Sequence, residues 1–356
     1  MTRRLGLTIH AEGRDQLPAS GRLHWLGALS FEERCLGSIT LLKRWGYRFA
    51  EATLVEYPTE IRPKEGERAR SMHRRRLQRD LGSCLGPCRT HPYRYIEFLR
   101  ILAGIADGLR EDPKGHLVID ITCMTKLHVM AVAYFLLTEG MSCDVSLAYS
   151  IPKLYGSPVR NIWGQGRWSG VVQARLDLDS THQHQRTFAV GLLGHEGDRL
   201  RLGLHEANPE ELLLLRMVQA KNRSSNVEAM VDIQNARLLR ELESSTRIQT
   251  AKRDIDLMRP SQLFSAVGSV CESARTAGAR VVLCPFGPKP SVFYATYAAL
   301  ERYREAIWAS YPTPTVYDAD YSHGLVETLW FTHAASRNQL GLFAPAPVGF
   351  LSEADV

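Results

Sequence analysis

Leu117-Val-Ile-Asp-Ile-Thr-Cys-Met-Thr-Lys126 is the stretch that decides the fold, because in it a short apolar run passes directly into polar residues. Residues 117–121 lack a strict alternation of apolar and polar positions, which is typical of a strand buried on both faces of a parallel sheet. Segment 127–138 then has the length and composition of a helix. The stretch therefore predicts a strand, a polar turn and a helix, the repeating unit of doubly wound α/β folds.

The same order of landmarks occurs twice along the chain. Apolar runs end in Ser30–Arg34, Thr122–Lys126 and Tyr149–Tyr155, and later in Gly194–Arg199, Pro285–Lys289 and Tyr311–Tyr317. The glutamate of the first landmark and the lysine of the second are 94 residues apart in the first half and 93 in the second. An identical Tyr-x-x-Pro-x-x-Tyr spacing closes both halves. We interpret this repeat as an internal duplication.

We predict an α/β protein made of two Rossmann-like parallel-sheet halves related by that duplication. The first half is expected at residues 1–165, with a basic insertion at 57–92, and the second at 186–356, with a helical insertion near 222–245. A linker is expected around 165–185. Each half is expected to run strand, helix, strand, helix, strand, helix, strand.

Composition places the chain among ordinary globular proteins. Its 356 residues are 44% hydrophobic and 23% charged, which excludes wholesale disorder and collagen-like repeats. The longest uncharged apolar run, Val129–Leu137, has nine residues. A membrane-spanning helix needs about twenty, so no membrane association is predicted. Seven scattered cysteines indicate a reducing, cytoplasmic location rather than a disulfide framework.

The positive charge is concentrated in one segment. Residues 62–94 carry ten lysines and arginines against three acids, whereas the net charge of the whole chain is only +6. The candidate nucleic-acid-binding residues of this segment are Arg70, Arg74, Arg75, Arg76 and Arg79, which could share one helical face. The alternatives are a mobile surface loop and a lid over an anionic ligand. Few aromatic residues are interleaved, which disfavours base stacking on single strands.

The polar landmarks all follow predicted strands, and ligands of doubly wound folds bind beyond the carboxyl ends of strands. Thr122, Thr125 and Lys126 open a predicted helix, where backbone N–H groups, hydroxyls and an ammonium group suit a phosphate or another anion. The alternative is that Thr125 only caps the helix while Lys126 points to solvent. Lys289 occupies the equivalent place in the second half.

The other candidate ligand-binding residues also occur in equivalent positions of the two halves. They are Glu32, Arg34, Tyr149 and Tyr155 in the first half, and Glu196, Arg199, Tyr311 and Tyr317 in the second. A carboxylate at a strand end can accept a hydrogen bond from a ribose hydroxyl, or it can pair with the arginine to brace the two halves. The tyrosines can stack on a base, or they can pack the loop after the last strand.

Residues 120–126 resemble a motif of CARF domains, which sense cyclic oligonucleotides in prokaryotic antiviral immunity. In that family a strand ends in an Asp/Asn-x-Thr-Gly-Gly-Thr-Lys type of motif. Here Cys123 and Met124 stand in place of the two glycines. The related SAVED domains are two CARF-like units fused in one chain, which is similar to the duplication described above. The resemblance implies that the two threonines and the lysine of the motif contact ligand phosphate.

These observations favour a nucleotide-binding sensor of a bacterial defence or signalling system, with an anionic nucleotide as its ligand. No nuclease, protease or membrane segment is recognisable, so such a sensor would act through an effector protein partner. One alternative is a nucleotide-processing hydrolase or phosphodiesterase that uses the strand-end lysines and glutamates. A second is a nucleic-acid-binding subunit acting through the basic segment. No cofactor is predicted, and no metal site, because Cys84, Cys88 and His91 lack a fourth ligand at the usual spacing.

Overall fold

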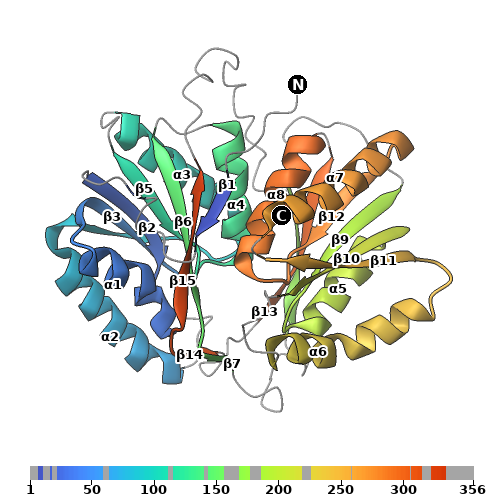
Figure 1. Ribbon diagram of the computed structural model, residues 1–356, viewed down its shortest axis with the longest axis horizontal. Helices are drawn as coiled ribbons and strands as arrows, with labels where there is room; N and C mark the ends of the chain where they lie inside the picture. The colour runs from blue at the N-terminus through green and yellow to red at the C-terminus, as the bar shows by residue number, and fades with distance from the viewer. Residues whose placement is uncertain are drawn as a thin grey trace.

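The computed structural model contains two α/β halves that lie side by side, as Figure 1 shows. The predicted fold class, two Rossmann-like α/β halves, is confirmed. The residues that the structure describes are 7–10, 17, 22–58, 64–110, 115–139, 143–155, 168–176, 186–218, 226–257, 259–304, 306–314 and 322–333.

The first sheet has seven strands in the order β1-β15-β6-β5-β2-β3-β4. These strands are β1 (Leu7–His10), β2 (Arg22–Ala28), β3 (Arg48–Glu56), β4 (Leu85–Arg89), β5 (His116–Asp120), β6 (Asp144–Ile151) and β15 (Glu327–His333). The five strands from β6 to β4 are parallel to one another, whereas β15 runs antiparallel to both β6 and β1.

The second sheet has six strands in the order β11-β10-β9-β12-β13-β8. These strands are β8 (Trp168–Arg175), β9 (Thr187–Leu193), β10 (Glu211–Val218), β11 (Gln249–Asp256), β12 (Arg280–Cys284) and β13 (Ile307–Pro314). Five are parallel and β8 is antiparallel to β13. The parallel strands follow the same order in both sheets: β4-β3-β2-β5-β6 in the first and β11-β10-β9-β12-β13 in the second. In each half, the third strand along the chain is therefore followed in the sheet by the second, first, fourth and fifth. The duplication hypothesis requires this common order.

Four helices connect the parallel strands in each half. They are α1 (Gly37–Arg44), α2 (Lys64–Leu81), α3 (Tyr95–Arg110) and α4 (Lys126–Thr138) in the first half, and α5 (Gly197–Ala207), α6 (Asn226–Glu243), α7 (Pro260–Ala277) and α8 (Lys289–Arg302) in the second. In the first half, α1 and α2 bury Ile39 and Leu77 in a core on one face of the sheet. Helices α3 and α4 bury Phe98 and Met130 on the other face.

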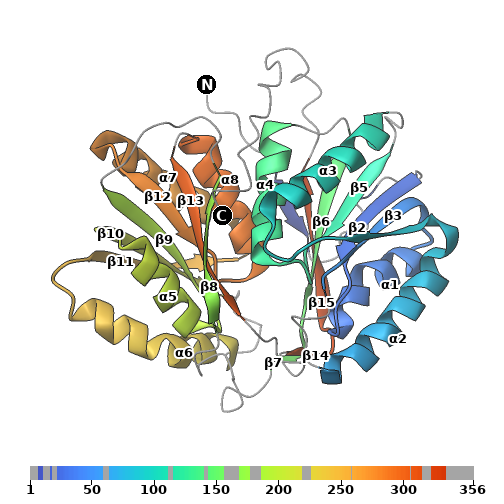
Figure 2. The ribbon, with the colours of Figure 1, turned by 180° about the vertical axis from the view of Figure 1, so that it is seen from behind.

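The two halves exchange one antiparallel strand each. β8 follows the first half in the chain but pairs with β13 of the second half, and β15 follows the second half but pairs with β6 of the first. In Figure 1 the red β15 therefore lies among the blue and green strands, and Figure 2 shows β8 beside the orange β13. The predicted linker around 165–185 thus contains a strand, and residues 327–333 belong to the sheet of the other half.

The segments interpreted as insertions are regular parts of the two sheets. Segment 57–92 contains α2 and β4, and segment 222–245 contains the equivalent α6, which leads to β11. The sequence analysis expected neither β4 nor β11, because both are edge strands with mostly exposed or half-buried residues. Such strands need no apolar pattern, since burial does not select their side chains.

The halves are joined through α4 and α8, which pack against each other in the middle of the molecule (Figure 1). A single hydrophobic core runs through this contact and includes Val129 of α4 and Phe293 of α8. A short ribbon of β7 (Leu154–Tyr155) and β14 (Ser322–His323) lies beyond the carboxyl ends of β6 and β13. None of the described helices has the length and apolar composition that a membrane span requires.

Candidate functional site

Lys126 lies at the start of α4 and reaches into the second half. Its Nζ donates a hydrogen bond to Glu196 Oε2 at 3.1 Å and another to the carbonyl oxygen of Phe286 at 2.9 Å. The side chain is only 12% exposed. The alternative in which Lys126 points to solvent is therefore wrong, because its ammonium group is held between two acceptors of the other half.

Lys289 makes the reciprocal contact from the start of α8. Its Nζ donates a hydrogen bond to the carbonyl oxygen of Thr122 in the first half, and its charge acts on Glu32. Thr122 and Phe286 occupy equivalent places after β5 and β12. Each lysine thus crosses to the strand end of the opposite half, in a pseudo-two-fold arrangement.

Each glutamate also pairs with the arginine of its own half. Arg34 donates hydrogen bonds through Nε and Nη2 to Glu32 Oε2, and through Nη1 to the carbonyl oxygen of Ser150 at 3.0 Å. Ser322, in β14, donates to the same Glu32 oxygen and accepts from Arg34 Nε. Neither Ser150 nor Ser322 is among the ligand-binding residues predicted from the sequence, although residues 318–324 have a composition that is often seen to line binding sites.

The second half repeats this pairing with equivalent residues but through different guanidinium nitrogens. Arg199 Nη1 donates to Glu196 Oε1 at 2.7 Å, and its Nε and Nη2 donate to the carbonyl oxygen of Pro312. The guanidinium group also lies over the rings of Phe286 and Tyr311, with its carbon 5.2 and 4.6 Å from their centroids. The Arg199–Glu196 pair is contained in the second half, and the contact that joins Glu196 to the first half comes from Lys126.

We call the six charged residues of this region the central cluster: Glu32, Arg34, Lys126, Glu196, Arg199 and Lys289. It contains two carboxylates and four cations, an excess of two positive charges. Asp120 is a third carboxyl group that interacts with Lys289, and burial raises its pKa. Counting Asp120 as ionised still leaves one excess positive charge, so the cluster is electrostatically suited to an anion.

Both glutamates of the central cluster stay ionised in spite of their burial. Burial opposes the charge of Glu196, but Arg199 and Lys126 outweigh it and lower its pKa to about 2. For Glu32, burial is likewise outweighed by Arg34, Lys289 and the hydrogen bond from Ser322, so its pKa is also lowered. At neutral pH these groups are acceptors only, and they are weak bases.

The pKa of Lys126 is lowered from the ordinary value of a lysine toward neutral pH. Burial disfavours its charged form, Glu196 favours it, and the nearby positive charges of Arg199 and Lys289 disfavour it, which lowers the pKa to about 8. The ammonium group is therefore less stable here than in water. An additional anion near it would favour its protonated form.

The two threonines of the motif hold the strand end and the helix start. Thr122 Oγ1 accepts a hydrogen bond from the backbone N–H of Ser150 at 2.9 Å. Thr125 caps α4, because its Oγ1 accepts from the backbone N–H of His128 at 3.3 Å while donating to the carbonyl oxygen of Pro92 at 2.8 Å. In this structure both hydroxyls are thus engaged by the protein itself.

The candidate tyrosines differ in their surroundings. Tyr149 is buried in the core of the first half. Tyr311 is also buried, and its ring is stacked on that of Phe286 with centroids 5.7 Å apart. Tyr155 contributes its backbone to β7, and Tyr317 lies outside the described residues. Protein groups therefore occupy one face of the Tyr311 ring.

The five candidate arginines of the basic segment do not share one face of α2. Arg70 is buried and turns toward the sheet, where its Nη2 donates to the carbonyl oxygen of Tyr57, and Arg74 pairs with Glu56 at 2.6 Å. Arg75 and Arg79 are exposed, and Arg76 is half-buried beside them. The arginines thus lie on different faces of α2. One face packs against the sheet, where the Glu56 carboxylate lies, and the other is exposed to solvent.

The cysteines of the first sheet do not form a metal site with their neighbours. Cys84 Sγ lies 3.2 Å from the carbonyl oxygen of Phe49, to which it donates. Among the residues that the structure describes, no group of three or more His, Cys, Asp or Glu side chains is arranged to hold a metal ion. Near the lysines, burial raises the pKa of the Cys123 thiol to about 12, so it is not a ready nucleophile.

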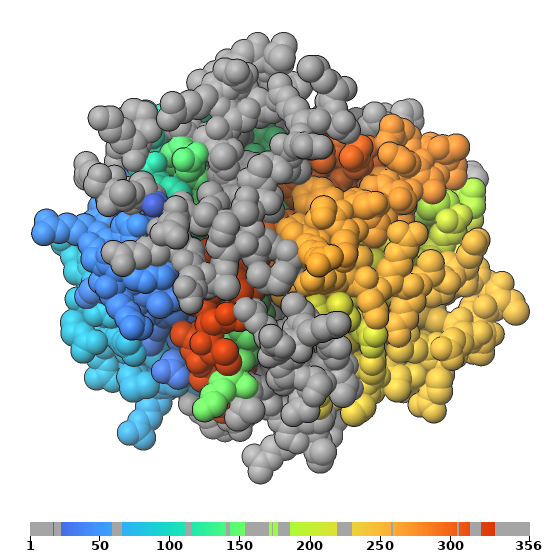
Figure 3. Space-filling model, in the orientation of Figure 1, coloured from blue at the N-terminus to red at the C-terminus, as the bar shows by residue number. Residues whose placement is uncertain are grey.

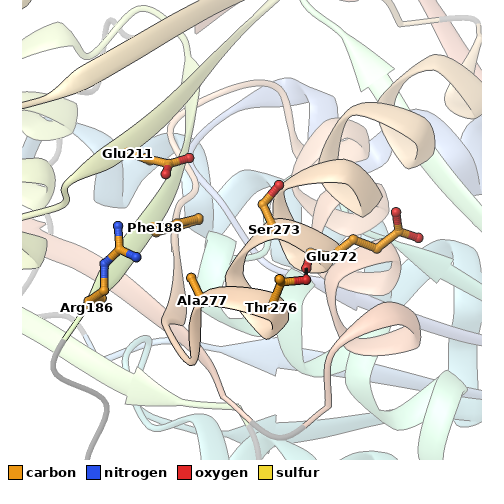
Figure 4. Close-up of a pocket in the computed structure, with 7 residues that line it drawn as sticks. All are labelled: Arg186, Phe188, Glu211, Glu272, Ser273, Thr276 and Ala277. Carbon is orange, nitrogen blue, oxygen red and sulfur yellow. Dashed lines mark hydrogen bonds between the residues drawn. The ribbon is translucent and has the colours of Figure 1, made fainter.

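A pocket of about 440 Å³ lies at the opposite edge of the second sheet, near the amino ends of β9 and β10. Figure 4 shows Arg186, Phe188 and Glu211 on one side of it and residues of α7 on the other. Arg186 is engaged there, because its Nε donates to Glu210 Oε2 at 2.8 Å. None of the predicted site residues lines this pocket, which is remote from the carboxyl ends of the strands.

No protein-family model matches the sequence, and no curated protein matches it either. The structure is similar to a solved structure described as a Type III CRISPR defence DNA nuclease activated by cyclic oligoadenylate, with a TM-score of 0.52 and 10% sequence identity. The match covers 81% of this chain and 65% of the nuclease chain, so this chain spans less than two thirds of the nuclease's length. At this identity the similarity establishes a common fold.

Proposed function

We propose that the protein is a sensor of an anionic nucleotide, and that the central cluster forms its binding site. The observation that carries the proposal is the reciprocal crossing of Lys126 and Lys289 at the carboxyl ends of both sheets. Parallel α/β sheets bind their ligands at this edge. The excess of one to two positive charges in a buried setting supports an anion as the ligand.

The pseudo-two-fold arrangement supports a ligand with repeated phosphates. A cyclic oligonucleotide with an even number of units has a two-fold axis, so it can present equivalent phosphates to two equivalent lysines. The similar nuclease is described as activated by cyclic oligoadenylate, and that description supports the same class of ligand here. It also supports a role in antiviral defence, in which the sensor acts on an effector partner.

Ligand binding at this site would change the contact between the halves. A phosphate that binds Lys126 competes with Glu196 and with the carbonyl oxygen of Phe286 for the same ammonium group. Release of these acceptors loosens the crossed contact, which is a direct route from ligand binding to a change in the relative position of the halves. The site thus couples binding to conformation without chemical conversion of the ligand.

The geometry favours binding over catalysis at this site. A general base needs a pKa near the working pH, whereas both cluster glutamates are held in their ionised form by arginine and lysine. The thiols of Cys123 and Cys284 have raised pKa values because they are buried. These glutamates and thiols do not supply the nucleophile or base that a nucleotide hydrolase needs. Lys126, whose pKa is lowered to about 8, has its ammonium group engaged by Glu196 and by the carbonyl oxygen of Phe286.

Binding of cyclic oligoadenylates of different ring sizes, measured by isothermal titration calorimetry, tests the proposal. We expect Lys126→Met and Lys289→Met each to weaken binding by about 10- to 100-fold, which corresponds to loss of one charge-assisted hydrogen bond. Lys252→Met, on the exposed edge strand β11, is the matched control and should bind as the parent does. Equal affinity of all three variants, or no binding of any ring size, would refute the proposed site.

A further inference from the structure

The outer surfaces of the two halves differ in charge although the halves share one topology. Helices α1 and α2 lie side by side on the outer surface of the first half, at the lower left of Figure 1, and the second half places α5 and α6 in the equivalent position. Figure 3 shows the α1 and α2 side as the blue surface at the left of the molecule. The α5–α6 surface can therefore serve as the reference for the charge of the α1–α2 surface.

We call the first surface the α1–α2 patch and define it by Lys43, Arg44, Arg75, Arg76 and Arg79. The two helices are in contact there, because Arg76 Nη2 donates to Thr40 Oγ1 at 3.4 Å and Lys43 Nζ to Asp80 Oδ1 at 3.2 Å. Asp80 is the acid shared by three of the cations, with Arg76 and Arg79 at 3.8 and 3.5 Å. Five cations against one carboxylate leave an excess of four positive charges.

The equivalent α5–α6 surface has no excess of positive charge. Its cations, Arg201, Arg237 and Arg240, are outnumbered by the carboxylates of the two helices, which are Asp198, Glu206, Glu228, Asp232, Glu241 and Glu243. Arg237 Nε lies 2.9 Å from Glu241 Oε1, and Arg201 lies within 3.9 Å of both Asp198 and Glu241. Helix-terminal cations stabilise a helix dipole, but both surfaces have such termini, so this effect does not explain why only one surface has a large excess of charge.

We infer that the α1–α2 patch binds the phosphate backbone of nucleic acid, independently of the function proposed above. Among the described residues, no carboxylate lies within salt-bridge distance of Arg44 or Arg75, which are both exposed. The four cations of the patch other than Lys43 are all arginines, whose planar guanidinium groups bind phosphate through two parallel hydrogen bonds. Unpaired exposed arginines at this density are the electrostatic footprint of a polyanion site.

The apolar composition of the patch distinguishes nucleic acid from an acidic protein partner. Met72 is the only large hydrophobic side chain exposed on the described part of α1 and α2. Protein interfaces take most of their binding energy from buried aromatic and aliphatic anchors, which are scarce here. Trp45 is not available, because its ring packs against Trp330 with centroids 5.6 Å apart. Because the patch offers no aromatic side chains on which bases could stack, it would contact the phosphate backbone alone. Binding is therefore independent of the nucleotide sequence.

Fluorescence anisotropy of a labelled 20-base-pair DNA duplex tests this inference with the full chain. The test variant is Arg75→Gln/Arg76→Gln/Arg79→Gln, and the matched control is Arg201→Gln/Arg237→Gln/Arg240→Gln on the α5–α6 surface. If four or five phosphates are contacted, the parent should lose roughly 100- to 500-fold in affinity between 50 and 200 mM salt. The test variant should reduce the slope of log K against log salt by about three, while the control leaves it unchanged.

Three results would overturn the inference. One is the absence of duplex binding at 50 mM salt. Another is an equal loss of binding in both triple variants, which would indicate a general charge effect. The third is retention of the parent on immobilised polyglutamate without binding to the duplex, which would assign the patch to an acidic protein surface. Thermal melting of both variants at the parent temperature confirms that the substitutions leave the fold intact.

Discussion

Lys126 Nζ lies 3.1 Å from Glu196 Oε2, so a lysine at the start of α4 is paired with a glutamate that precedes α5 in the other half. Lys289 returns the contact to the carbonyl oxygen of Thr122. The two halves are thus held together at their strand ends by buried charges. Because a buried ion pair depends on both partners, this region should respond strongly to substitution of one of them.

Glu196→Gln is expected to destabilise the protein by about 3–5 kcal/mol. The amide keeps the size of the side chain but leaves Lys126 and Arg199 buried without their counter-charge. Urea denaturation at pH 7 measures the free energy of unfolding. Glu243→Gln, on the exposed face of α6, is the control and should change it by less than about 0.5 kcal/mol. Equal stability of the two variants would show that Glu196 is not a structural counter-ion.

Stability should fall as the pH is lowered through the acidic range. The pKa of Glu196 is lowered from 4.5 to about 2 and that of Glu32 is lowered as well, so both bind protons more readily in the unfolded chain. Their contribution is therefore fully present above about pH 4.5 and is lost as the pH falls toward 2. Urea midpoints between pH 7 and pH 3 measure this loss. It should be smaller in Glu32→Gln/Glu196→Gln, and an unchanged pH dependence would contradict the prediction.

Removal of β15 should expose the edge of β6 and destabilise the first sheet. A chain ending at residue 320 lacks the antiparallel partner of β6 and is expected to aggregate or to melt at a lower temperature. A synthetic peptide of residues 322–333 should restore the melting temperature by strand addition. The control peptide carries Leu329→Lys and Phe331→Lys, two buried positions of β15, and should not restore it. Full stability of the truncated chain would argue against the strand exchange.

Gly194→Ala should disturb the strand end that faces Phe286. A Cβ at this position would lie 2.0 Å from the carbonyl oxygen of Phe286, the acceptor of Lys126, so the backbone must shift. Gly104→Ala is the matched control, because no heavy atom lies within 4 Å of its added Cβ in α3. The control should be more stable than the parent by up to about 1 kcal/mol, and Gly194→Ala less stable. Thermal and urea unfolding measure both changes, and two variants of equal stability would contradict the predicted close approach.

Local patterns in the sequence were sufficient for the fold class and for much of the helix content. The helix expected near 222–245 is α6, Asn226–Glu243, in the structure, and the helix predicted at 127–138 begins one residue earlier. The apolar runs 117–121 and 187–193 form buried central strands, β5 and β9. These predictions succeed because hydrophobic periodicity and run length reflect burial, which is the same for every residue of a central strand.

The candidate site was predictable in its positions but not in its partners. Spacings of 94 and 93 residues within the two halves pointed to Glu32 with Glu196 and to Lys126 with Lys289 as equivalent residues. Spacing within a half contains no information on which groups of the other half they meet. Two of those groups, the carbonyl oxygens of Thr122 and Phe286, carry no side-chain signal at all.

The sequence by itself thus determined the alternation of strands and helices, the repeat, and the basic and acidic residues placed at strand ends. Only the tertiary structure decided that β8 and β15 change halves, that β4 and β11 extend the sheets, and that the two lysines cross. The edge strands β4, β8 and β11 are held by backbone hydrogen bonds, which every residue except proline can donate, so their side chains do not specify the partner strand. The buried apolar residues of β15 show that it lies inside a sheet, but they do not show in which half. The crossing depends on how α4 packs against α8, and that packing sums many weak contacts between distant parts of the chain.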